Sequence, residues 1–130
     1  MSDTGRILIA DDEETVLRTT AVLLGEEGFD CDKAHNAVEA LELLGKNSYD
    51  LLIADWKMPG NTKLEMLSEL RSTGHDLPVI VVTGYPQFSA AAQNAEIGVF
   101  AEVVKPFDFD DFLSVVRKGV AEGQSRHAGK

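Results

Sequence analysis

Five polar side chains stand where short apolar runs of the sequence end. Asp11 and Asp12 follow the run ILIA, Asp55 follows LLIA, Thr83 follows VIVV and Lys105 follows AEVV. If these runs are parallel strands, their carboxyl ends open on one edge of the sheet and bring the five residues into one crevice. Three carboxylates, a hydroxyl and an ammonium are groups that can bind a hard cation and hold a phosphate beside it.

The predicted crevice has an excess of negative charge. Three aspartates against one lysine leave two negative charges on groups that repel at close range. A divalent cation would neutralise them, and ligands that are all oxygen favour Mg²⁺, which retains waters and uses one or two carboxylates with a phosphate. We therefore expect Mg²⁺ as the cofactor. The three histidines, His35, His75 and His127, are expected at the surface, and none is spaced from another as a metal ligand would be.

The elements that would position these residues alternate along the chain. Apolar runs at 6–10, 29–34, 50–54, 78–82 and 99–104 are typical of buried strands. Helical spacing occupies 14–27, the stretch between Asn36 and Gly45, 64–72, 87–97 and the stretch after Asp108. Gly28 and Gly45 are expected to end the first two of these helices, and Asn36 is expected to cap the second. This alternation predicts an α/β fold, a doubly wound five-stranded parallel sheet with helices on both faces. Residues 122–130 are small and polar, and we expect them to fray or to begin a linker.

Length and charge exclude several classes of protein. At 130 residues the chain has room for one domain, and its formal net charge of −10 would repel nucleic acid and anionic membranes alike. Cys31 stands alone, which excludes an internal disulfide and a cysteine-rich zinc site. The first residues lack the apolar stretch of a signal peptide, so we expect a cytoplasmic protein.

Four motifs together resemble the receiver domains of two-component response regulators. They are ADDEE, DWKMP, VTG and VKPF, and their order and separation make the resemblance specific over residues 5–121. The resemblance implies a single domain over 1–130 with the flavodoxin-like strand order 2-1-3-4-5. It also implies a phosphorelay signalling switch, with a sensor histidine kinase or a phosphotransfer protein as the partner that supplies the phosphoryl group. Such a domain phosphorylates and dephosphorylates itself and turns over no external substrate.

The resemblance implies a role for each residue around the phosphorylation site. Asp55 would accept the phosphoryl group and contact Mg²⁺. Asp12 would bind the ion directly, Asp11 would bind it through water, and the backbone carbonyl of Lys57 would complete the protein ligands. These roles agree with the chemistry, because phosphoryl transfer requires position and counter-charge more than covalent assistance.

The resemblance also implies a switch that is driven by charge. Thr83 and Lys105 would each contact a phosphoryl oxygen, and the movement of Thr83 would change the surface of the fourth helix, fifth strand and fifth helix. The partners of that surface would be a downstream protein or an effector domain outside this chain, and a phosphorylation-dependent homodimer is a further expectation.

Three residues modify the expected switch. Glu102 occupies the position where receivers commonly carry an aromatic ring that turns inward, and a buried carboxylate would be costly there. Lys57 and Tyr85 stand two residues beyond Asp55 and Thr83, where they would flank the attacking water. We expect their bulk to slow autodephosphorylation.

Other interpretations of these residues and of the function are possible from the sequence. Asp11 and Asp12 could simply cap the first helix. A Mg²⁺-dependent phosphohydrolase of the haloacid dehalogenase type would need a second aspartate two residues after its nucleophile, and a flavodoxin would need a Ser/Thr-rich phosphate loop in place of four consecutive acids. A degenerate receiver that only binds other proteins is opposed by the intact set of five polar residues and favoured by Glu102.

Overall fold

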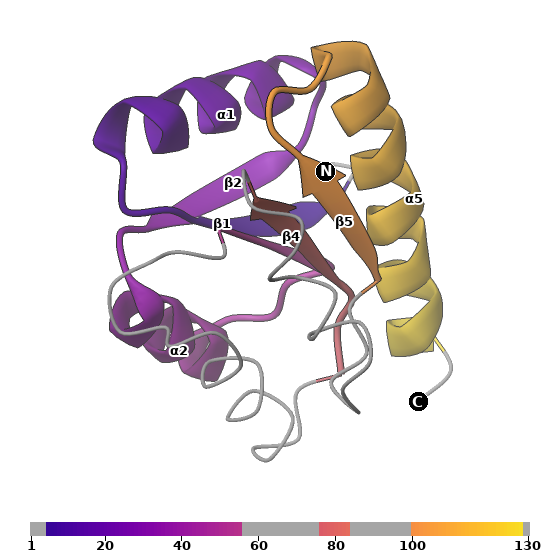
Figure 1. Ribbon diagram of the computed structural model, residues 1–130. Coiled ribbons are helices and arrows are strands. Elements are labelled where there is room, and N and C mark those ends of the chain that lie inside the picture. The colour runs from indigo at the N-terminus through magenta and orange to yellow at the C-terminus, as the bar shows by residue number, and fades with distance from the viewer. Residues whose placement is uncertain (1–4, 56–75, 84–99, 129–130) are drawn as a thin grey trace.

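The sheet has the predicted order. The computed structural model describes residues 5–55, 76–83 and 100–128. Its five strands are β1 (Arg6–Ala10), β2 (Asp30–Ala34), β3 (Leu51–Asp55), β4 (Val79–Thr83) and β5 (Ala101–Val104), and they form one parallel sheet in the order β2-β1-β3-β4-β5 (Figure 1). The predicted fold class is confirmed. The helices expected at 64–72 and 87–97 lie outside the described residues.

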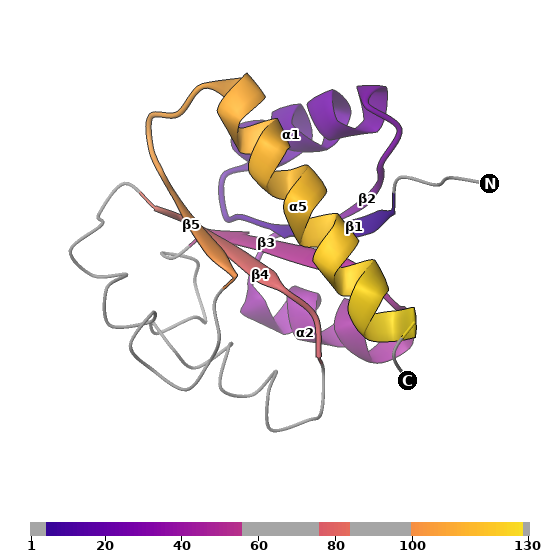
Figure 2. The same cartoon turned by 90° about the vertical axis from the view of Figure 1, so that its right-hand side faces the viewer.

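Helices cover both faces of the sheet. Helices α1 (Glu14–Glu26) and α5 (Phe109–Ala128) lie on one face, and α2 (Ala37–Lys46) lies on the other (Figure 2). Successive residues of a strand point to opposite faces, so Ile7 and Ile53 pack on the α1 and α5 side while Leu8 packs on the α2 side. Because both faces of the central strands are buried, these strands read in the sequence as unbroken apolar runs. No helix in the described ranges is long and apolar enough to cross a membrane.

The helix ends near the predicted site differ in how they are fixed. Asn36 caps α2 as predicted, since its side-chain oxygen accepts a hydrogen bond of 2.8 Å from the backbone N–H of Glu39. Glu13, the N-cap residue of α1, makes no such side-chain hydrogen bond. Gly28 follows α1 with a φ of 98°, as its predicted stop requires. Gly45 was expected to end α2, but that helix continues to Lys46.

Residues 122–128 continue helix α5, so the predicted fraying does not occur there. Arg126 holds this end of the helix with ion pairs to Glu122 at 2.9 Å and to Asp76, ahead of β4, at 3.2 Å. Gly123 lies so close to the start of β3 that a Cβ atom there would be 1.8 Å from the carbonyl oxygen of Asp50. The last turns are therefore stabilised by tertiary contacts that a polar composition does not reveal.

Candidate functional site

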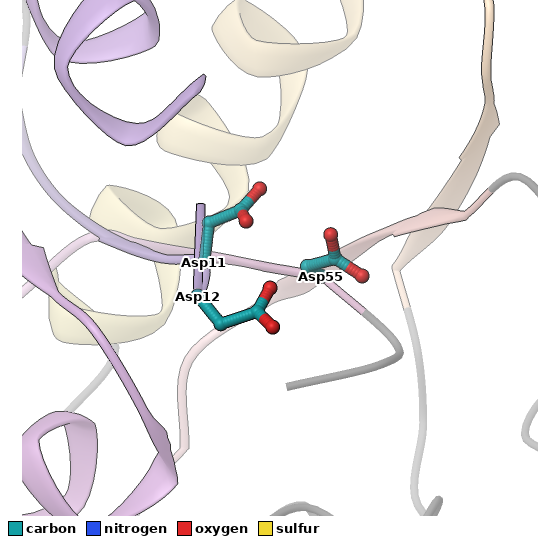
Figure 3. A group of neighbouring side chains, drawn as sticks. All are labelled: Asp11, Asp12 and Asp55. Atoms are coloured by element: carbon teal, nitrogen blue, oxygen red, sulfur yellow. The ribbon is translucent and has the colours of Figure 1, made fainter. Parts of the chain in front are cut away.

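Three carboxylates meet at the carboxyl edge of the sheet. Asp11 and Asp12 follow β1, and Asp55 is the last residue of the neighbouring strand β3. One carboxylate oxygen from each residue lies within 4.8 Å of the other two (Figure 3). Asp11 and Asp55 are 5% and 8% exposed, whereas Asp12 is open to solvent. The structure thus brings together the three carboxylates that the sequence placed at strand ends.

Lys105 completes this group with a positive charge. It follows β5, two strands away from β3, and its Nζ donates a hydrogen bond of 3.1 Å to Oδ2 of Asp55. Partial burial alone would lower the pKa of Lys105, but the hydrogen bond and the negative charge of Asp55 outweigh it and raise this pKa. Lys105 therefore remains a cation throughout the neutral range.

The charged form of Asp11 is disfavoured in this arrangement. Burial and the nearby charges of Asp55 and Asp12 raise the pKa of Asp11 to about 6. A hydrogen bond of 2.9 Å from the backbone N–H of Glu13 opposes this rise. The hydrogen bond from Glu13 fixes the turn before α1, but Glu13 precedes the first helical residue, Glu14, so this contact is not a helix cap. The carboxylate of Asp11 still faces two other acids, so a cation placed among them would be favoured.

The pKa of Asp11 leads to a prediction about stability. A carboxyl whose native pKa lies above its unfolded value stabilises the fold fully only below the unfolded value, 3.8, and loses that contribution as the pH rises through about 6. Asp11→Asn keeps an acceptor for Glu13 and removes the charge. We expect it to raise the free energy of unfolding at pH 7 by about 1 to 3 kcal/mol, and hardly at all at pH 4.

Urea titrations in EDTA at the two pH values measure this effect. A stabilisation of the same size at both would show that charge is not its cause. A loss of stability at pH 7 would show that the carboxylate of Asp11 is well accommodated without a cation.

The remaining predicted site residues are placed only in part. Thr83 ends β4 opposite Val104, so its backbone lies at the same edge of the sheet as Asp55. The side chain of Thr83, together with Lys57 and Tyr85, lies outside the described residues. Glu102 is half-buried on β5.

Two features near the carboxylates were not predicted. A cavity of about 30 Å³ lies beside Asp11, Asp55 and Lys105, and the aromatic rings of Phe107 and Phe112 form part of its wall. These rings stack at 4.8 Å between centroids. The sequence signal for this cavity is the motif VKPF next to the apolar residues of α5. The second feature is His35, which is exposed as expected but bonded to two carboxylates.

Comparison with known proteins assigns the family. Residues 7–117 match the model of the response regulator receiver domain. The chain belongs to this family. Receiver domains of two-component response regulators are signalling switches rather than enzymes that turn over an external substrate.

Individual relatives agree with this assignment. The chain is 31% identical over 122 residues to the uncharacterized transcriptional regulatory protein YkoG of Bacillus subtilis, covering 94% of this chain and 54% of YkoG. It is 29% identical to sporulation initiation phosphotransferase F of the same organism, covering 87% of this chain and 91% of that protein. Response regulator TrrA of Thermotoga maritima, solved in complex with Mg²⁺-BeF, superposes with a TM-score of 0.76 at 35% identity, covering 87% and 96% of the two chains. The chain thus spans about half the length of YkoG.

Proposed function

We propose that this receiver domain is a cytoplasmic phosphorelay switch in which Asp55 accepts a phosphoryl group from a phosphohistidine. The donor is a sensor histidine kinase or a phosphotransfer protein. One observation carries the proposal: one carboxylate oxygen from each of Asp11, Asp12 and Asp55 lies within 4.8 Å of the other two, and Nζ of Lys105 lies 3.1 Å from Oδ2 of Asp55. The group thus combines a nucleophile, a place for a cation and a fixed counter-charge.

The donor atoms fit Mg²⁺. All three side chains offer carboxylate oxygens, and the excess negative charge among them favours a divalent cation. We propose that Asp12 and Asp55 bind it directly, that Asp11 does so through water, and that the backbone carbonyl of Lys57 completes the protein ligands. When bound, Mg²⁺ supplies positive charge at the acceptor and phosphoryl oxygens. The complex of TrrA with Mg²⁺-BeF supports this choice of metal.

Each residue of the site has a different role in the transfer of the phosphoryl group. An oxygen of Asp55 forms the new bond to phosphorus as the bond from phosphorus to the donor imidazole breaks, and the electron pair of that bond returns to the imidazole nitrogen. Lys105 donates to a phosphoryl oxygen, as does the hydroxyl of Thr83. Such interactions are effective because the transition state is loose and its charge is spread over the phosphoryl oxygens.

Phosphorylation then changes the surface around β5 and α5. The carboxylate of Asp55 is replaced by a group of about two negative charges with three acceptor oxygens, which draws Thr83 and Lys105 toward it. We propose that the fourth helix, β5 and α5 carry this change to a downstream protein, to an effector domain or to a second copy of the chain. Residues 1–130 would act in this as one domain.

A degenerate receiver that binds partners without phosphorylation is the second candidate. Glu102, half-buried on β5 at the position where an aromatic ring is common, favours it. The assembled carboxylates and Lys105 favour a working phosphorylation site instead.

Incubation with acetyl phosphate and Mg²⁺, followed by intact-protein mass measurement, separates the two candidates. We expect the wild type to gain one phosphoryl group and to lose this gain in EDTA, whereas Asp55→Asn gains none. No gain on the wild type, or an equal gain on Asp55→Asn, would contradict the proposal.

The lifetime of the phosphoryl group gives a further prediction. If Lys57 and Tyr85 obstruct the attacking water, the Lys57→Asn, Tyr85→Ala double variant should lose its phosphoryl group faster than the wild type. Dephosphorylation followed by mass after removal of acetyl phosphate measures both half-lives. An equal or longer half-life in the double variant would show that these side chains do not protect the acyl phosphate.

A further inference from the structure

His35 joins the first turns of two helices beside the acidic site. Its Nε2 lies 2.6 Å from Oε1 of Glu14, the first residue of α1, and its Nδ1 lies 3.0 Å from Oε1 of Glu39 in the first turn of α2. The backbone N–H of His35 also donates to Glu39 at 2.7 Å. We call His35, Glu14 and Glu39 the His35 clamp.

One side of the His35 clamp is firmly anchored. Glu39 is fixed at its backbone by the Asn36 cap of α2 and at its side chain by His35. Both ring nitrogens of His35 meet carboxylate oxygens, and only a doubly protonated imidazole can donate to both. These hydrogen bonds, first to Glu14 and then to Glu39, raise the pKa of His35 and favour that charged form.

The other side of the clamp is the segment that carries the metal-site aspartates. Helix α1 has no side-chain cap of its own at Glu13. The backbone N–H of Asp11 donates to the carbonyl of Ala34 at 3.0 Å, and Glu14 is bound by His35, the next residue along the chain from Ala34. The turn after β2 therefore holds the segment 11–14 at two points, one on each side of Asp12.

We propose that His35 is a positioning residue that supplies the missing restraint at the start of α1 and thereby fixes Asp12 for the divalent cation. The inference rests on the proposed function, since it concerns the same cation site. Four consecutive acids, residues 11–14, repel one another, and an uncapped helix end frays readily. Without the clamp, the segment that carries Asp12 would lose its second point of attachment.

Replacing His35 shows whether it acts by positioning Asp12 or by its charge, because the two roles change the affinity for Mg²⁺ in opposite directions. The hydrogen bonds to Glu14 and Glu39 favour the charged form of His35, and that charge alone would oppose Mg²⁺ binding, so its loss would tighten binding. Loss of positioning would weaken binding instead. Lys33 provides the matched control, because it is an exposed cation whose charge also acts on Glu14 but which takes no part in the hydrogen bonds of the clamp.

The experiment measures Mg²⁺ binding by isothermal titration calorimetry at pH 7 and amide hydrogen exchange of the metal-free protein. For His35→Gln we expect a dissociation constant about three- to tenfold higher than that of the wild type, at or below the lower end of the effect that residues behind the metal ligands have. Exchange should become faster in the first turn of α1, where Leu17 donates to Glu13, and stay unchanged in α5. Lys33→Gln should bind Mg²⁺ as tightly as the wild type or more tightly.

Rescue completes the test. His35→Arg keeps a positive charge and a fork of donors that can contact both carboxylates, so it should restore most of the affinity. An equal or lower dissociation constant for His35→Gln would overturn the inference while leaving the proposed function standing. A wild type that binds no Mg²⁺ would overturn both.

Discussion

Lys105→Met is expected to slow phosphorylation of Asp55 by about two orders of magnitude, because the loss of one fixed donor to developing charge typically costs that much. Methionine keeps much of the length of lysine but has no charge and no donor. The same substitution removes a cation that lies 3.1 Å from Asp55, so Mg²⁺ should bind more tightly. The two effects have opposite directions, which a damaged fold would not produce.

The rate of mass gain with acetyl phosphate at saturating Mg²⁺, together with a Mg²⁺ titration, measures both effects. Lys118→Met, which removes a charge from the exposed surface of α5, is the matched control and should leave both unchanged. Phosphorylation of Lys105→Met at the wild-type rate would remove Lys105 from the mechanism. A rate and an affinity that fall together would indicate that the substitution disturbs the carboxylates themselves.

Gly123→Ala is expected to cause the largest loss of stability from a single added methyl group. Its Cβ would lie 1.8 Å from the carbonyl oxygen and 2.6 Å from the carbonyl carbon of Asp50, which are backbone atoms that cannot rotate away. Helix α5 or the start of β3 must move. Alanine gains about 1 kcal/mol of helix propensity over glycine, but we expect overpacking to outweigh it and to lower the free energy of unfolding by about 2 to 4 kcal/mol.

Gly45→Ala is the matched control on α2, where a Cβ would meet no atom of the described residues within 4 Å. It should stabilise the protein by about 0.5 to 1 kcal/mol through propensity alone. Urea unfolding of the two variants measures the contrast. Equal stabilisation of both would mean that the last turns of α5 do not pack against β3.

The sheet and the core of the site could be predicted from the sequence because both follow from local patterns. Strands buried on both faces must be continuously apolar, and a polar residue that ends such a strand must lie at the carboxyl edge of the sheet. Those two rules alone placed Asp11, Asp12, Asp55 and Lys105 together. The strand order came from the resemblance to receiver domains and not from the pattern.

The features that were missed depend on contacts between distant parts of the chain. Residues 122–128 are polar, and their helix is stabilised by the approach of Gly123 to Asp50 and by the ion pair of Arg126 with Asp76. His35 looked like any surface histidine, because Glu14 lies 21 residues before it and becomes its neighbour only when β2 pairs with β1. No local periodicity carries such information.

A crystal structure of the protein with Mn²⁺ in place of Mg²⁺ and with beryllofluoride in place of the phosphoryl group would locate both the cation and the acceptor oxygen. We expect one anomalous peak for the metal among the carboxylates of Asp11, Asp12 and Asp55. We also expect beryllium bound to a carboxylate oxygen of Asp55, with Nζ of Lys105 in contact with a fluorine. A metal peak elsewhere, or beryllofluoride bound to another residue, would contradict the proposed function.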